Sequence, residues 1–214
     1  MAQPTTLGDR IDAEFSAADQ KIKQLQKQQV ERYQHRQQRQ EKLDQILEAH
    51  RDVWRTRLET LANRFANRIK VTPRVAPGRR QATLEVDSEL ARIVLKFSVT
   101  ADQEVENAVF QYDLDILPIY MKFESHSELV FPLENIDRQA LEQWMDDRIM
   151  GFVRTYMSLY ENDHYLKDHM VVDPVAKVRF PRFAAAATLE TKGKTVYFIS
   201  EDTCRQYEQQ QAGK

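Results

Sequence analysis

The 214-residue sequence is poor in residues that cross-link or interrupt a chain. It contains one cysteine, Cys204, so neither an intramolecular disulfide nor an all-cysteine metal site can form within one chain. The 5 glycines and 7 prolines are few for this length, which indicates long regular elements and few tight loops. No apolar run approaches the ~20 residues that a membrane span requires, so we expect no transmembrane helix.

No sign of charge dominates either. The formal net charge is −2 and the isoelectric point is about 6.2, which disfavours a strongly basic nucleic-acid binder. The N-terminal residues MAQPTTLGDR lack the basic start and apolar block of a signal peptide, and we expect a reducing, cytoplasmic location. Hydrophobic residues make up 42%, so part of the chain must fold around a core.

The balanced charge hides an uneven distribution. Residues 1–70 carry 14 Lys and Arg against 10 Asp and Glu, whereas residues 71–134 carry 6 against 11. A basic arm attached to an acidic body favours self-association or docking over a catalytic field.

The basic arm has the pattern of one long helix. Between Gly8 and Pro73 there is neither glycine nor proline, and Asp9 or Asp12 could cap the start. A straight helix from Asp9 to Lys70 would extend about 93 Å. Its apolar positions step by three and four, as in a seam that packs on a partner helix. They are Ile11, Phe15, Ala18, Ile22 and Leu25, then Leu43, Leu47, His50, Trp54, Leu58, Leu61, Phe65 and Ile69.

Between the two apolar runs, residues 26–42 are almost entirely polar. One interpretation is a nucleic-acid arm, because Arg32, Arg36 and Arg39 alternate with glutamine. The other is the solvated, Gln-rich middle of a coiled coil, which we favour because acidic residues interrupt the basic run. We therefore predict a stalk that forms a homodimer. Nucleic-acid binding, there or through Arg79 and Arg80, is the weaker alternative. The predicted oligomerisation contacts are Ile11, Phe15, Ile22 and Leu25.

From Gln81 the apolar period changes from 3.6 to 2, which indicates strands. The expected strands contain Leu84 and Val86, then Ile93 to Val99, Phe110 to Ile116, Ile119 to Phe123, and Leu129 to Phe131. Their short connections predict an antiparallel meander with one buried face. A helix capped by Asn135 or Asp137 should cover that face, together with the last turns of the long helix. The fold class is therefore α+β.

Two carboxylate pairs are candidates for catalytic or cation-binding groups, Asp113 with Asp115 and Glu104 with Glu106. Members of a pair stand two residues apart and so face the same side of a strand. Because they alternate with apolar residues, we interpret them as the solvated sheet face. The sequence has no Gly-rich phosphate loop, no GxSxG and no HExxH, so we predict a non-enzymatic protein.

Residues 171–208 read VVDPVAKVRFPRFAAAATLETKGKTVYFISEDTCRQYE. The order of parts is Asp-Pro-Val at 173–175, a small-residue stretch, a hairpin around Gly193 and Lys194, the aromatic strand at 197–198, and Ser200 followed by Cys204–Arg205. This segment resembles the YHS family, a treble-clef-like, metal-associated module related to the TRASH group. The resemblance implies a metal site at its cysteines, but two of those positions are Ala176 and Ile199 here.

One thiol cannot by itself build a site for copper, zinc or iron. We expect a degenerate, metal-free YHS-like module in which apolar packing of Ala176 and Ile199 replaces the metal, and we expect no cofactor. The alternative is metal binding or thiol redox sensing by Cys204 with His164 and His169. Ser200 could cap a short final helix and place Cys204 in its first turn, although Glu201 and Asp202 oppose thiolate formation.

The predicted organisation is a helical stalk (1–70), a linker (71–80), an α+β body (81–170) and a YHS-like hairpin and helix module (171–214). The predicted function is a self-associating interaction or scaffold protein with an unidentified protein partner and no membrane contact.

Overall fold

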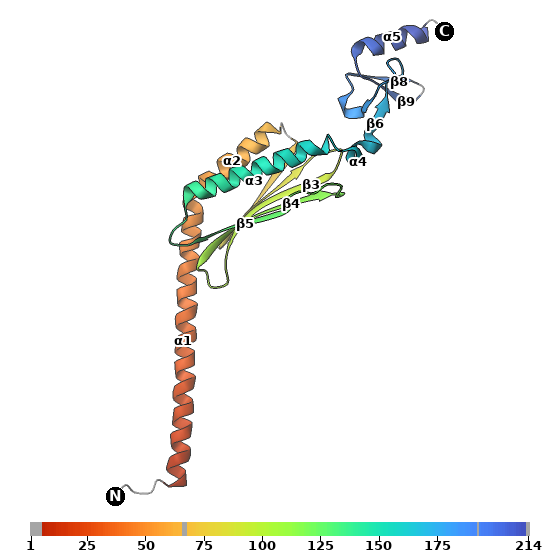
Figure 1. Cartoon of the computed structure of the whole chain (residues 1–214). Coiled ribbons are helices and arrows are strands. Elements are labelled where there is room, and N and C mark those ends of the chain that lie inside the picture. Colours follow the sequence, from red (N-terminus) through yellow and green to blue (C-terminus); the bar gives the residue numbers. More distant parts are fainter. Residues whose placement is uncertain (1–5, 66–67, 192, 213–214) are drawn as a thin grey trace.

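The structure is a computed structural model that describes residues 6–65, 68–191 and 193–212. It contains a long N-terminal helix, a five-stranded antiparallel sheet with two covering helices, and a small C-terminal part, arranged in that order in space (Figure 1). The mixed α and β architecture with a long N-terminal helix agrees with the fold class predicted from the sequence. None of the helices in the described ranges is long and apolar enough to cross a membrane.

The long helix divides in two at His50. Helix α1 runs from Leu7 to Ala49 and helix α2 from Arg51 to Arg64. His50 has non-helical backbone angles, and its Nδ1 lies 2.9 Å from the Ile46 carbonyl oxygen at the end of α1. The single helix expected from Asp9 to Lys70 was therefore wrong in its length, because α2 turns to pack on the body. The start of α1 is capped by Thr6 in a capping box with Asp9, rather than by Asp9 or Asp12.

The sheet follows chain order and every neighbouring pair is antiparallel, as the meander prediction required. Its strands are β1 (Ile69–Ala76), β2 (Arg79–Val86), β3 (Arg92–Ala101), β4 (Asn107–Leu117) and β5 (His126–Pro132). Two expectations fail here. Residues 71–80 form most of the β1–β2 hairpin instead of a linker, with Gly78 at φ 64° in the turn. Residues 119–123, expected as a strand, form a loop between β4 and β5.

The alternating apolar residues of β2, β3 and β4 face one side and form the core. Helix α3 (Arg138–Leu159) and α2 cover that side, and Asp137 caps α3 by accepting a hydrogen bond from the Ala140 N–H at 3.0 Å. Trp54 of α2 stacks on Phe110 with ring centroids 5.6 Å apart. Burial of each such side chain contributes about 1.5–3 kcal/mol, so this packing explains why the chain bends at His50.

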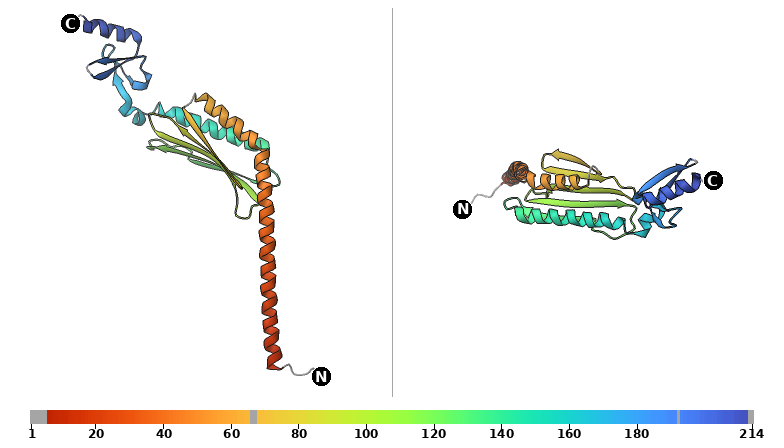
Figure 2. Two further views of the ribbon diagram at one scale, coloured as in Figure 1. Left: turned by 180° about the vertical axis from the view of Figure 1, so that it is seen from behind. Right: turned by 90° about the horizontal axis from the view of Figure 1, so that it is seen from above.

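The C-terminal part begins with α4 (Asp163–Leu166) and a 3₁₀ turn (Lys167–His169). Two short hairpins follow, β6 (Met170–Val172) with β7 (Arg179–Pro181) and β8 (Ala187–Thr191) with β9 (Lys194–Phe198), and helix α5 (Glu201–Ala212) ends it. Residues 170–212 are named the C-terminal module below. The module lies at the end of the body away from α1 (Figure 2). Arg182 pairs with Glu89 of the body at 3.1 Å.

Candidate functional site

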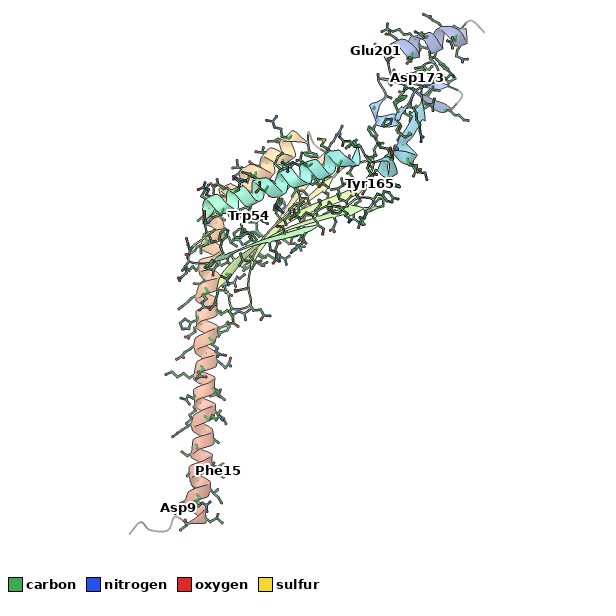
Figure 3. The ribbon with its side chains drawn as sticks, viewed as in Figure 1. Asp9, Phe15, Trp54, Tyr165, Asp173 and Glu201 are labelled. Atoms are coloured by element: carbon green, nitrogen blue, oxygen red, sulfur yellow. The ribbon has the colours of Figure 1, made fainter. Side chains whose placement is uncertain are left out.

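The outer part of α1 carries an apolar seam that the rest of the described chain leaves uncovered. Ile11, Phe15, Ile22 and Leu25 are 46%, 68%, 53% and 52% exposed. We call these four residues the stalk seam. Phe15 lies near the outer end of α1, far from Trp54 in the core (Figure 3). The helix holds these side chains on one face because they follow one another after four, seven and three residues.

The same face of α1 turns into the core farther along. Leu25 and Leu43 are 18 residues apart, which is five helical turns, so they point the same way. Leu43 is fully buried and Leu47 nearly so. The stalk seam therefore faces the same side of α1 as the body does.

Ion pairs fix the inner part of α1 to the body. The Arg39 guanidinium donates to the Glu104 carbonyl oxygen at 3.0 Å and to the Glu106 carboxylate at 3.1 Å. Asp44 lies 3.0 Å from the Arg80 guanidinium and accepts from the Gly78 N–H, also at 3.0 Å. Two of the basic residues weighed for nucleic-acid binding, Arg39 and Arg80, are thus engaged in contacts within the chain.

The carboxylates weighed for catalysis do not act as pairs. On the outer sheet face, Asp113 lies 3.2 Å from Lys96 and 2.7 Å from the His126 Nδ1, whereas Asp115 is exposed. Burial opposes ionisation of Asp113, but hydrogen bonds from His126 and Lys96 lower its pKa below the usual value. The hydrogen bond to Asp113 in turn raises the pKa of His126. Both shifts are those of a cross-strand ion pair on a solvated face.

A groove of about 570 Å³ lies between α2 and the edge strand β1. Apolar side chains of α2, β1 and β2 line it. They include Trp54, Leu58, Val71, Pro73, Val75 and Ala82. The cations at its helical rim are already paired, Arg51 with Glu48 at 2.9 Å and Arg55 with Glu59 at 2.7 Å.

The three residues proposed as metal ligands lie on separate elements. His164 is in α4, where its ring stands 5.8 Å from that of Tyr120, and His169 Nδ1 lies 4.0 Å from Glu89. Cys204 is in the first turns of α5. Within residues 6–65, 68–191 and 193–212, no three His, Cys, Asp or Glu side chains gather as a metal would require.

The environment of Cys204 opposes thiolate formation. Burial raises the pKa of this thiol, and the nearby carboxylates of Glu208, Asp173 and Glu201 raise it further, while Arg205 lowers it. The Ser200 hydroxyl accepts from the Thr203 N–H at 3.2 Å and so caps α5 as predicted. The position near a helix N-terminus therefore does not make Cys204 a low-pKa thiol.

A single buried carboxylate joins the parts of the C-terminal module, and sequence reasoning missed its role. Asp173 accepts hydrogen bonds from the N–H groups of Val175 (2.8 Å), Ala176 (2.9 Å) and Ile199 (3.0 Å) and from the Thr203 hydroxyl (2.7 Å). Burial of Asp173 raises its pKa, but these donors outweigh that effect and lower the pKa to about 2. Figure 3 places Asp173 inside the module.

This arrangement corrects one expectation. Ala176 is exposed and Ile199 is 40% exposed, so packing of their side chains against each other does not replace the metal of the YHS pattern. Instead, their backbone N–H groups meet at the Asp173 carboxylate. The signal available in the sequence was the Asp of Asp-Pro-Val, a residue type that accepts hydrogen bonds from N–H groups two and three positions on.

Comparison of the chain with protein-family models, with curated proteins and with solved structures finds no match. The YHS resemblance of residues 171–208 therefore stays a prediction.

Proposed function

We propose that this chain is a self-associating, non-enzymatic interaction or scaffold protein of the cytoplasm that forms a homodimer through the stalk seam. The observation that carries the proposal is the exposure of all four seam residues on a helix that projects clear of the body (Figure 1). A helix surrounded by solvent on all sides would be expected to carry polar residues on every face.

The energetics of a lone stalk support this proposal. Residues 26–42 of α1 are almost entirely polar, and packing within the chain begins only near Arg39 and Leu43. Helices in proteins gain most of their stability from the packing of an apolar face. Apolar residues spaced by three and four supply such a face for a second helix.

The body and the C-terminal module would supply surfaces for an unidentified protein partner. The groove between α2 and β1 is open and apolar. In the module, Asp173 accepts the hydrogen bonds that join its segments, which supports a degenerate, metal-free YHS-like docking module.

The test is the molar mass in solution, measured by sedimentation and light scattering over a range of concentrations. We expect a concentration-dependent dimer, and we expect a monomer for Ile22→Asp/Leu25→Asp. The matched control, Gln20→Asp/Gln24→Asp, adds the same two charges on the opposite face of α1 and should remain dimeric. A wild-type chain that is monomeric throughout, or a control that dissociates equally, would contradict the proposal.

A further inference from the structure

The charge along the outer part of α1 is divided into two blocks of opposite sign. Residues 7–19 carry four acidic residues and one basic residue, a net charge of −3. Residues 20–32 carry four basic residues and one acidic residue, a net charge of +3. Both blocks flank the stalk seam, so the orientation of a partner helix decides which charges meet.

The body adds a steric constraint on that partner. It occupies the seam side of α1 from Arg39 onward, because Arg39 contacts the loop before β4 and Leu43 is buried on the face that Leu25 also occupies. A parallel, in-register partner helix would run along this side into the body. A helix that ends before residue 39 would avoid it.

We propose that two copies of the chain pair antiparallel along the stalk seam, with residues 7–33 of each side by side and a two-fold axis near Gln20. The inference rests on the proposed self-association and names its partner and geometry. In this register Phe15 lies opposite Leu25 of the second copy, and Ala18 lies opposite Ile22. The overlap of 27 residues is about 40 Å long, and each helix ends opposite Tyr33, short of the body.

The antiparallel orientation places each −3 block beside a +3 block, whereas the parallel one places like beside like. At the seam the blocks lie within a Debye length of about 8 Å. The two orientations therefore differ in electrostatic energy at physiological salt. Exposed charge pairs contribute little individually. The apolar layers therefore supply the affinity, while the charge blocks select the orientation.

Distances between spin labels distinguish the two orientations without disturbing the seam. In a Cys204→Ser background, one label each is placed on the outer face of α1 at Ala13→Cys, Gln20→Cys or Gln34→Cys. The antiparallel pair predicts axial separations of about 21, 0 and 42 Å for these sites, by a rise of 1.5 Å per residue. A parallel in-register pair predicts the same short distance at all three sites.

Equal short distances would overturn the antiparallel geometry while leaving self-association intact. A monomeric mass with no dipolar coupling at any site would overturn both this inference and the proposed function. The two proposals therefore fail in distinguishable ways.

Charge reversal gives an independent readout. Lys27→Glu should weaken the dimer about tenfold at low salt. In the stated register Lys27 lies level with Ala13 of the second copy, between Asp12 and Glu14, so four favourable contacts between copies become unfavourable. Adding Asp12→Lys/Glu14→Lys should restore the affinity. An unchanged or tighter dimer for the first variant would contradict the inference, because only a parallel pair gains from losing positive charge on positive charge.

Discussion

Leu25 and Leu43 occupy the same face of the same helix, yet Leu25 is 52% exposed and Leu43 is fully buried. The difference arises outside the helix, since the body reaches α1 only from about Arg39 onward. A pattern of apolar residues at helical spacing thus predicts that a face will be covered, but not whether the same chain covers it.

Two comparisons between aspartates, one bound within the chain and one exposed, show the same contrast. Asp173 is buried and accepts four hydrogen bonds, while nearby Asp168 is exposed. Asp113 is bound by Lys96 and His126, while Asp115, two residues on, is exposed. In each comparison, one aspartate makes contacts within the chain and the other is exposed. Substitution of the exposed aspartate is therefore the control for substitution of the bound one.

The largest effect is expected for the leucines. Leu43→Ala should lower the free energy of unfolding by about 3 kcal/mol, because it removes buried methyl groups and leaves a cavity. Leu25→Ala should change it by less than about 0.5 kcal/mol when measured by urea unfolding on dilute, monomeric protein. Equal destabilisation by both substitutions would mean that the outer seam packs within its own chain.

A smaller effect is expected for Asp173. Asp173→Ala should destabilise the C-terminal module by about 2 kcal/mol, because three N–H groups and one hydroxyl lose a charged acceptor. Amide hydrogen exchange of Ala176 and Ile199 measures this, and Asp168→Ala is the matched control. Unchanged protection of these two amides in Asp173→Ala would contradict the assigned role.

The pKa of Asp173 adds a pH dependence to the same prediction. Its folded value of about 2 lies below the unfolded value of about 3.9. The stabilisation is therefore complete above about pH 5 and is lost as the pH falls through about 2. Asp173→Asn should flatten the acid branch of the profile.

The third contrast concerns a titration. His126 should titrate above its ordinary pKa of about 6.5, because Asp113 accepts a hydrogen bond from its protonated ring. By NMR, Asp113→Asn should move the midpoint down toward the ordinary value, whereas Asp115→Asn should leave it in place. The ion pair contributes stability below pH 6.5 that is lost as the pH rises through the folded value.

The smallest expected signal concerns metal. Protein purified without chelator and then offered copper, zinc or iron under reducing conditions should hold far less than one ion per chain by elemental analysis. The expectation rests on the placement of the one thiol and the two histidines on separate elements. One ion per chain that disappears in Cys204→Ser would support the metal-binding alternative instead.

Strands β2 to β4 and helix α3 could be predicted because their apolar residues alternate or recur toward one buried face. Strand β5 could be predicted in part, because the partly buried Leu129 and Phe131 pack against the same core. Strand β1 could not, since six of its eight residues are exposed and Pro73 resembles a linker residue. The bend at His50 has no glycine or proline to mark it. It follows from the packing of Trp54 on Phe110, which the helical pattern does not encode.

For the candidate site, the periodicity identified the seam residues because the sharing of one helical face is a local property of spacing. The role of Asp173 escaped sequence reasoning because two of its partners are distant in the chain. The Ile199 N–H lies 26 residues away and the Thr203 hydroxyl 30 residues away. Only the folded chain brings them to one carboxylate.

The edge strand β1 bears on the kind of assembly that this chain can build. An open sheet edge invites strands of other molecules and growth into fibres. Pro73 supplies no N–H for such pairing, and Lys70 and Arg74 place charges along the same strand. Growth through the sheet is thereby discouraged. The proposed two-fold pair at the stalk seam would close on itself, so an assembly of that kind would stay finite.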